Sequence, residues 1–438
     1  MPNRPETGVR GRRAYLNARI VDPASGYDGP GGIVVDGVQI EAVGPNVTAE
    51  SVRGIQAEDC GGHVLAPGLI DARVFTGEPG AEFRETLATA SEAAAAGGVT
   101  TFLAMPDTDP VIDDIALVDF IRRRARDTAI VHIEAAAALT MGLNGKDMTE
   151  IGLLAEAGAR AFTDGRHSIR NAALMRRLLT YAGNFDAVVM NHVEDPSLAS
   201  EGVMNEGELA SRLGLPGIPC TAETIVLERD IAITRLTGGR YHASLISCAP
   251  SRELVRKAKN DGLKVTCGVS VNHLALNEND IGNYRTFCKM APPLRGEDDR
   301  MAMVDGIADG TIDIIVSNHD PQDVDDKRRP FAEAADGAVG VETLLPALLR
   351  LVNADVIGLN DVLAAVTHRP ADLLGLPQGR LQPGAPADII LFDPEMPWVL
   401  GRGDLNSRSK NTPFDGARFE GRVLWTMVAG QKVWAYRP

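Results

Sequence analysis

Residues 68–75 read Gly-Leu-Ile-Asp-Ala-Arg-Val-Phe and open the long central part of the chain. Here a short apolar run ends in polar side chains, and similar runs recur downstream, each followed by a helix-like segment. The expected strands lie near residues 68–73, 100–104, 131–135, 160–163, 187–191, 241–246, 264–268 and 312–317. Strands that alternate with helices in this number predict an α/β fold, a (β/α)8 barrel of the TIM type. A doubly wound open sheet is the alternative.

The two ends of the chain have a different pattern, with short alternating segments broken by Gly, Pro and Asp. Residues 32–40 predict a hairpin, because Asp-Gly separates two apolar runs. Similar runs return beyond residue 380. We therefore expect residues 14–67 and 380–438 to form one small composite β-sandwich domain, and residues 68–379 to form the barrel domain.

The composition is that of a soluble globular protein of 438 residues, with 44% hydrophobic and 24% charged residues. A net charge of −15 disfavours nucleic acid and anionic membranes as partners. No apolar run approaches the length of a membrane span, and residues 1–6 lack the apolar core of a signal peptide. The five cysteines are scattered and have no Cys-x-x-Cys spacing, so we expect a cytoplasmic protein with free thiols.

Polar residues follow several of the expected strands. Arg73, Asp164, His192, His273 and residues 318–320 all lie at or just beyond a strand end. Because the carboxyl ends of the strands form the active-site face of a parallel barrel, we expect a candidate site there.

Short motifs recur in order at residues 66–71, 78–80, 93–101, 104–108, 161–164, 192–195, 291–295, 340–346 and 409–416. Together they resemble the dihydroorotase branch of the cyclic amidohydrolases over residues 14–435. The resemblance implies hydrolysis or closure of a cyclic amide, with dihydroorotate and carbamoyl aspartate as the reaction pair. That chemistry needs a metal-bound hydroxide, because neutral water is a poor nucleophile toward an amide.

Most of the family's metal ligands are replaced. The first-strand motif of the family, Gly-Leu-Ile-Asp-x-His-x-His, has Arg73 and Phe75 at its two histidines, and the sixth-strand ligand becomes Leu245. Arginine keeps its proton and phenylalanine has no lone pair, so neither can hold a metal. Asp164 and His192 remain as remnant ligands. A catalytic zinc site generally uses three protein ligands, so we expect no cofactor, and zinc only if the site proves functional.

The catalytic and substrate-binding positions are replaced as well. The last barrel motif of the family, Asp-His-Ala-Pro-His, reads Asn-His-Asp-Pro-Gln at residues 318–322. The general-base aspartate is thus replaced by Asn318, whose amide cannot accept a proton. The positions that hold the substrate in the family are all substituted and correspond to Gly77, Asp107, Ala291 and Gln322.

Two hypotheses concern the altered strand ends. In the first, the guanidinium of Arg73 occupies the emptied metal position and neutralises Asp164, because a buried anion needs a counter-charge. The alternative is that Arg73 points to solvent. In the second, the loop residue His167 folds inward and completes a metal site.

The replacement of metal ligands, general base and substrate-binding residues predicts a catalytically inactive, dihydroorotase-like protein of pyrimidine biosynthesis. The resemblance to noncatalytic dihydroorotase homologues implies a structural partnership with aspartate carbamoyltransferase, and a homo-oligomer, a dimer or larger, is expected. The alternative is an active dihydroorotase or another cyclic-amide hydrolase. Such an enzyme has either an incomplete metal site or a repurposed site in which His192, His319 and Asp320 form a new acid–base group.

Overall fold

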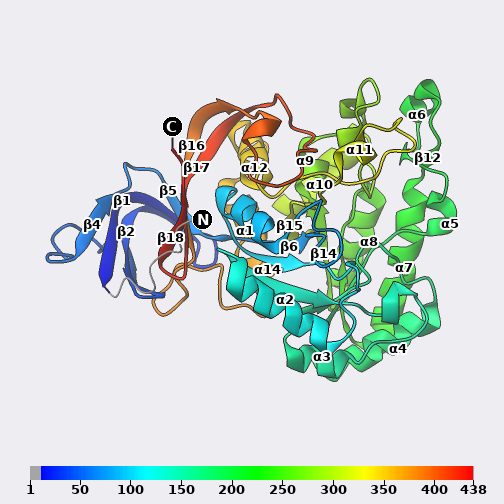
Figure 1. The fold of residues 1–438 in the computed structure, drawn as a ribbon, viewed down its shortest axis with the longest axis horizontal. Helices are drawn as coiled ribbons and strands as arrows, with labels where there is room; N and C mark the ends of the chain where they lie inside the picture. Colours follow the sequence, from blue (N-terminus) through cyan, green and yellow to red (C-terminus); the bar gives the residue numbers. More distant parts are fainter. Residues whose placement is uncertain (1–10, 438) are drawn as a thin grey trace.

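The computed structural model describes residues 11–437 and contains two large sheets, one from the chain ends and one from the central part (Figure 1). The expectation about a signal peptide in residues 1–6 lies outside the described residues. Within residues 11–437, no helix has both the length and the apolar character that crossing a membrane requires.

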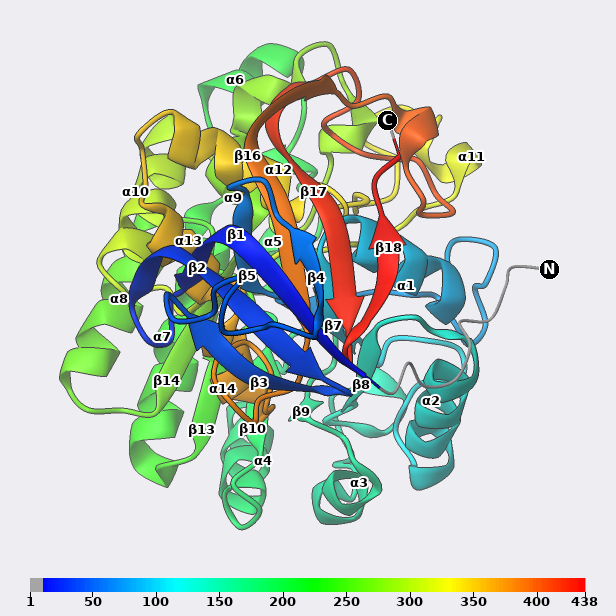
Figure 2. The ribbon, with the colours of Figure 1, turned by 90° about the vertical axis from the view of Figure 1, so that its left-hand side faces the viewer.

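The terminal sheet combines strands from both ends of the chain (Figure 2). Its strands are β1 (Arg12–Asp22), β2 (Tyr27–Asp36), β3 (Gln39–Gly44), β4 (Gln56–Asp59), β5 (Val64–Pro67), β16 (Ile389–Val399), β17 (Arg418–Val428) and β18 (Gln431–Ala435). The order is β18-β17-β16-β5-β1-β2-β3, and β4 pairs with β1. The hairpin expected at 32–40 is confirmed, because β2 and β3 are antiparallel and Asp36 pairs with Gln39.

Strand β5 joins the two ends of the chain within this sheet. It pairs parallel with β1 and antiparallel with β16. The strands from the two ends of the chain share one hydrophobic core. In it, the ring centres of Tyr15 on β1 and Trp425 on β17 lie 5.2 Å apart. Removal of these apolar surfaces from water holds the first and last parts of the chain together.

The central sheet is a closed parallel barrel. Its strands are β6 (Leu69–Val74), β7 (Val99–Ala104), β8 (His132–Ala137), β9 (Ala161–Phe162), β10 (Val188–Asn191), β13 (Arg240–Ala243), β14 (Val265–Ser270) and β15 (Ile314–Val316). The edge strands meet just beyond β15, where the Phe75 N–H donates to the His319 carbonyl at 2.9 Å. The expected barrel is therefore confirmed, and closure excludes the open doubly wound sheet.

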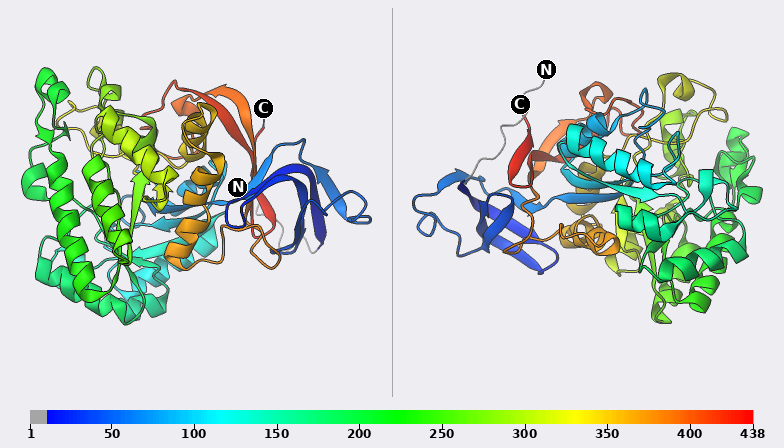
Figure 3. Two further views of the ribbon diagram at one scale, coloured as in Figure 1. Left: turned by 180° about the vertical axis from the view of Figure 1, so that it is seen from behind. Right: turned by 60° about the horizontal axis from the view of Figure 1, so that its bottom comes forward.

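Helices follow the barrel strands and cover their outer face (Figure 3). They are α1 (Leu87–Ala96), α2 (Ile115–Thr128), α3 (Ile151–Ala157), α4 (Ala172–Gly183), α5 (Pro196–Ala199), α6 (Glu208–Leu213), α7 (Cys220–Thr237), α8 (Ala249–Asn260), α9 (Val271–Ala275), α10 (Glu297–Ala308), α11 (Val324–Lys327), α12 (Leu344–Asn353), α13 (Leu359–Ala365) and α14 (His368–Leu374). A short strand pair, β11 (Met204–Asn205) and β12 (Gly217–Ile218), interrupts the connection from β10 to α7.

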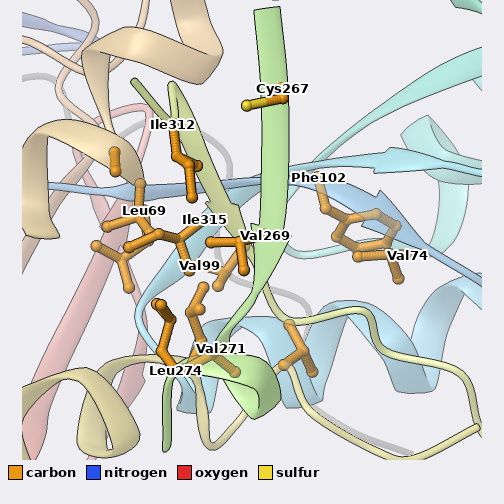
Figure 4. Close-up of a cluster of buried hydrophobic side chains, with 14 of the residues drawn as sticks. Leu69, Val74, Val99, Phe102, Cys267, Val269, Val271, Leu274, Ile312 and Ile315 are labelled. Carbon is orange, nitrogen blue, oxygen red and sulfur yellow. The ribbon is translucent and has the colours of Figure 1, made fainter. Parts of the chain in front are cut away.

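Alternation along the strands separates two apolar layers. Cys267 and Val269 of β14 belong to the layer between strands and helices, together with Leu69 and Val99 (Figure 4). A second cluster fills the barrel interior and includes residues such as Ile70, Phe75, Leu103 and Leu245. Because successive side chains on a strand face opposite sides, the polar residues at the strand ends are placed at the mouth of the barrel.

Candidate functional site

Arg73 lies at the end of β6 and is buried. Its Nε donates to Asn318 Oδ1 at 3.1 Å, and one of its terminal nitrogens donates to the Gly165 carbonyl at 3.3 Å. The other terminal nitrogen, Nη1, has no hydrogen-bond partner among residues 11–437. Burial lowers the pKa of Arg73 to about 10, although the nearby Asp107 carboxylate opposes this shift.

The hypothesis that Arg73 neutralises Asp164 is wrong, and so is the alternative that Arg73 points to solvent. The Asp164 carboxylate accepts hydrogen bonds from the backbone N–H groups of Leu139 and Thr140 at 2.9 and 3.0 Å, and from the Thr140 hydroxyl at 2.5 Å. Burial raises the pKa of Asp164, while these donors lower it. The loop after β8 therefore satisfies this carboxylate, and no guanidinium is needed.

A second arginine, Arg166, pairs with two carboxylates that the sequence analysis left without a counter-charge. Its Nη1 lies 2.6 Å from Asp107 Oδ2, and its Nε lies 3.0 Å from Asp320 Oδ2. The guanidinium carbon stacks 3.7 Å from the centre of the Phe75 ring. Burial alone lowers the pKa of Arg166, but Asp320 and Asp107 raise it above its ordinary value. We call Arg73, Phe75, Asp107, Arg166 and Asp320 the arginine cluster.

Arg166 was missed because it belongs to none of the family motifs. A signal for it existed, since Asp107 and Asp320 follow β7 and β15, the strands on either side of β6, and buried anions need a cation. Gly165 makes the pairing sterically feasible. Its φ is +63°, and a Cβ there would lie 2.6 Å from the Asp107 side chain. Only glycine lets the loop after β9 approach Asp107 so closely.

The residues that follow β15 have three separate roles. Asn318 accepts from Arg73 and donates to the Ala291 carbonyl at 3.4 Å. His319 is buried, and its Nε2 lies 3.6 Å from a carboxylate oxygen of Glu85. Asp320 belongs to the arginine cluster. Asn318 therefore holds Arg73 in place, and its amide cannot act as a general base.

The three residues of the repurposed-site alternative have different partners. His319 Nδ1 accepts from the backbone of Gly340 and Val341, and its other nitrogen faces Glu85. His192 Nε2 lies 3.7 Å from Glu194. Asp320 pairs with Arg166, as described above. The structure therefore does not assemble an acid–base group from His192, His319 and Asp320.

Both remnant ligands line one cavity of about 470 Å³ at the barrel mouth. The strand-end loops after β8, β9 and β10 form its wall, which includes Lys146, Asp164, Arg166, His167 and His192. His192 is buried, and its Nδ1 has no partner in the described part of the chain. The two expected remnant ligands thus line the same cavity, whereas Arg73, Phe75 and Leu245 stand where the resemblance places the other ligands.

The side chains present do not fit a metal ion. Within residues 11–437, no group of three or more His, Cys, Asp or Glu side chains could hold one. His167 is exposed and does not complete a set of ligands with Asp164 and His192. Leu245 packs in the interior of the barrel with Phe75. The side chains of residues 11–437 therefore do not form the zinc site that is typical of the family.

The four positions that hold substrate in the family have structural contacts here. Asp107 pairs with Arg166, and Gln322 donates to Asp320 at 2.6 Å. Gly77 has a φ of +74°, and its carbonyl accepts from the N–H of Ala81 at 2.6 Å. Ala291 accepts from Asn318. Two of the four positions thus serve the arginine cluster, and none presents a cation to a substrate carboxylate.

Comparisons with known proteins agree with this barrel and its motifs. The family model described as "Dihydro-orotase-like" matches residues 62–251. The dihydroorotase of Anaplasma phagocytophilum (strain HZ) is 41% identical over 425 residues, which cover 96% of this chain and 95% of that protein. The dihydroorotase of Syntrophus aciditrophicus (strain SB) is 37% identical over 420 residues, which cover 95% of this chain and 97% of that protein.

Solved structures show the same fold. The L-hydantoinase (dihydropyrimidinase) from Arthrobacter aurescens superposes with a TM-score of 0.88 at 23% identity, covering 97% of this chain and 96% of that one. The dihydropyrimidinase from Brevibacillus agri NCHU1002 superposes with a TM-score of 0.83 at 20% identity, covering 97% of this chain and 95% of that one. With the sequence identity extending over nearly its full length, the chain belongs to the dihydroorotase family of the amidohydrolase superfamily.

Proposed function

We propose that this protein is a dihydroorotase-like component of pyrimidine biosynthesis that has lost catalysis and serves as a structural partner of aspartate carbamoyltransferase. The observation that carries the proposal is the arginine cluster. Arg166 bridges Asp107 and Asp320 and stacks on Phe75, beside the buried Arg73. This arrangement uses the strand ends for internal ion pairs.

The chemistry of the cluster opposes the family reaction. Hydrolysis of a cyclic amide needs a metal-bound hydroxide and a group that accepts a proton. Two guanidinium groups repel a divalent cation, and neither releases a proton at neutral pH. The amide of Asn318 accepts a hydrogen bond from Arg73 and cannot accept a proton. Nucleophile, acid–base group and substrate anchor are all missing from these positions.

The cluster also gives a reason for a stable barrel without chemistry. A metal-dependent barrel gains stability from its bound ion, whereas here Asp107 and Asp320 find their counter-charge in Arg166. The resemblance to noncatalytic dihydroorotase homologues supports a role as an assembly partner of aspartate carbamoyltransferase. We propose that the protein forms a homo-oligomer for this purpose.

Metal content and turnover measured on the same sample test the loss of catalysis. The full chain is purified without chelator or affinity tag, and the Anaplasma phagocytophilum dihydroorotase is prepared in parallel as an assay control. We expect substoichiometric zinc and no hydrolysis of dihydroorotate. Asn318→Asp is expected to stay inactive, because it restores a carboxylate and no metal ligand from β6. Stoichiometric zinc together with turnover in the unmodified protein would contradict the proposal.

The partnership is tested separately, by co-expression with the aspartate carbamoyltransferase chain of the same organism. We expect the two chains to co-elute in size-exclusion chromatography with light scattering, with a mass that exceeds either protein alone. Separate elution at micromolar concentrations would contradict the partnership and leave the loss of catalysis untouched.

An active dihydroorotase or other cyclic-amide hydrolase is the second candidate. The names of the relatives favour it, and so does the cavity that retains Asp164 and His192. This candidate predicts that added zinc produces turnover of dihydroorotate or a related cyclic amide and that His192→Gln abolishes it.

A further inference from the structure

Two cations in the cavity at the barrel mouth have no partner within the described part of the protein. Lys146 lies on the loop after β8, and Arg170 lies on the loop after β9, just before α4. Both are exposed, and within residues 11–437 neither side chain forms a hydrogen bond or an ion pair. Arg170 affects the Asp195 carboxylate only through space, and that carboxylate is hydrogen-bonded by the Ser197 N–H at 2.8 Å. The cavity therefore presents two unpaired positive charges.

Each of the other charged side chains that line this cavity has a partner. Asp164 accepts from the loop after β8, including the Thr140 N–H at 3.0 Å, and Arg166 pairs with the two carboxylates of the arginine cluster. Glu194 faces His192 Nε2 at 3.7 Å. Positive charge is therefore in excess here, although the whole chain carries a net charge of −15. A chain of this charge repels anions in general, so the local cations are what attracts an anion to the cavity.

Two further polar atoms of the cavity wall are buried without a partner. His192 is 4% exposed, and its Nδ1 forms no hydrogen bond within residues 11–437. The hydroxyl of Ser168 is also buried and unpaired in this part of the chain. Buried polar atoms in folded proteins are nearly always hydrogen-bonded. A polar ligand that enters the cavity would supply the partners that these two atoms lack.

The backbone around Arg170 is held in place and brings a helix end to the cavity. The Arg170 carbonyl accepts from Arg229 Nη1 at 2.9 Å, and the Ile169 N–H donates to Asn191 Oδ1 at 3.1 Å. Asn171, which also lines the cavity, caps the 12-residue helix α4. The positive end of the helix dipole therefore lies beside the two unpaired cations, and helix N-termini favour phosphate and other anions.

We propose that this cavity binds the phosphate group of a small phosphorylated metabolite. Lys146 and Arg170 contact the phosphate oxygens, and the Ser168 hydroxyl donates a further hydrogen bond. A phosphate group suits the site better than a carboxylate, because it carries more negative charge at neutral pH and offers three acceptor oxygens to separate donors. The cavity of about 470 Å³ has the size of a metabolite pocket, about 300–1,000 Å³, and Leu143 and Pro196 offer apolar contact to the rest of the ligand.

The inference rests on the part of the proposed function that leaves the cavity without a metal. It adds a ligand class to a barrel mouth that has lost its chemistry. The two statements can fail separately. Zinc is measured before treatment with chelator, because stoichiometric zinc at that stage would contradict the proposed function. The phosphate site is then tested on the zinc-free protein in either case, so that no bound metal contributes to the binding.

Titration of the full chain with inorganic phosphate tests the site. Binding is measured by isothermal titration calorimetry after removal of the chelator, with chloride added to keep the ionic strength constant. We expect one site per chain with a dissociation constant of about 1 mM or below, since a ligand of five heavy atoms can gain only a few kcal/mol. Acetate, titrated in the same way, should bind at least about tenfold more weakly, because it has one charge and two oxygens.

Matched variants assign the binding to the cavity. Lys146→Ala and Arg170→Ala should each weaken phosphate binding about tenfold, because each removes a charged donor. Both residues are exposed, so the variants should fold. Arg177→Ala removes an exposed arginine of α4 outside the cavity and should change the affinity by less than about twofold.

Four outcomes would each overturn the proposal. They are no phosphate binding by the zinc-free protein, an affinity that Lys146→Ala and Arg170→Ala leave unchanged, an equal loss in Arg177→Ala, and acetate binding as tight as that of phosphate.

Discussion

Two sides of the barrel carry different kinds of buried polar groups. On the β6 and β15 side, Arg73 and Arg166 lie beside Asp107 and Asp320, and the two guanidinium groups keep their protons at neutral pH. The side of β13 and β14 carries two buried imidazoles, His242 on β13 and His273 just beyond β14, together with the buried pair Arg295 and Glu223. Burial lowers the pKa of His242 to about 3 and that of His273 to about 4, so both are neutral at pH 7.

The difference shows two ways in which a barrel can keep polar residues without a metal. Charges on the first side are compensated by each other, so the loss of one member leaves another unpaired. The imidazoles on the second side form hydrogen bonds as neutral groups and need no counter-charge. His242 Nδ1 lies 2.9 Å from the Thr266 hydroxyl, and His273 Nε2 donates to the Pro292 carbonyl at 3.1 Å. The first side should therefore be sensitive to substitution, and the second side to acid.

Arg166→Ala should produce the largest effect. It removes the only cation that is hydrogen-bonded to Asp107 and Asp320 within residues 11–437, and removing one partner of a buried ion pair costs about 3 kcal/mol of unfolding free energy. About a third of the Arg166 side chain is exposed, so water offsets part of a larger loss. Urea denaturation gives the value. Arg170→Ala, an exposed arginine that lines the same cavity, is the control and should change the unfolding free energy by less than about 0.5 kcal/mol.

Arg73→Ala should come next, with a loss of about 2 kcal/mol, because it leaves the Asn318 amide oxygen unsatisfied and opens a cavity. Arg73→Met retains most of the side-chain volume and removes a buried charge, so its loss should stay below about 1 kcal/mol. Equal destabilisation by both variants would show that the charge of Arg73, rather than its volume, supports the barrel. An unchanged melting temperature for Arg73→Ala would show that its contacts carry no stability.

Acid should act through the imidazole side. The folded-state pKa values of His242 and His273 lie below the usual 6.5, so their stability contribution is present above pH 6.5 and is lost as the pH falls toward the folded values. Between pH 7 and pH 5 each imidazole contributes a loss of about 2 kcal/mol. Asp71 acts oppositely, because burial raises its pKa to about 6 and its protonation in this range favours the folded state.

Comparison of His242→Gln with the unmodified protein isolates one imidazole from these opposing contributions. The variant should lose about 2 kcal/mol less than the unmodified protein between pH 7 and pH 5, as measured by urea denaturation at both pH values. Parallel pH profiles for the two proteins would mean that His242 does not become neutral on folding, and the contrast between the two sides would fail.

His192→Gln should have the smallest effect, within about 1 kcal/mol, because Nδ1 of His192 has no partner in residues 11–437 and Glu194 remains partly exposed to water. Zinc supplies a sharper readout. Added zinc should raise the melting temperature of neither protein. A zinc-dependent rise in the unmodified protein that disappears in His192→Gln would identify a metal site and restore the enzyme candidate.

The fold followed from the sequence because its signals are local and repeated. Each barrel strand, from β6 to β15, was visible as a short apolar run between helix-like segments, and the observed bounds differ by only a few residues. The terminal sheet was visible in the turn residues of the Asp36–Gln39 hairpin. Closure of the barrel depends on contacts between residues far apart in the chain, such as Phe75 and His319, and was inferred from the number of strands.

The candidate site was predicted only in part. The sequence alone predicted the loss of metal ligands at Arg73, Phe75 and Leu245 and of the general base at Asn318. The capacity of a side chain to bind a metal or a proton depends on its own chemistry. The sequence did not predict the pairing of Asp164 with Thr140 or the position of Arg166. The partners of Arg166 lie 59 and 154 positions away, and no spacing in the sequence relates them.

The sequence by itself determined the fold, the family and the chemical groups that were removed from the barrel mouth. Only the tertiary structure decided which anion each guanidinium meets, since hydrogen bonds and ion pairs act over a few ångströms and depend on where the strand ends converge. Arg73 illustrates the distinction. Its inability to bind a metal is a property of the guanidinium group, whereas its bond to Asn318 rather than to Asp164 is a property of the closed barrel.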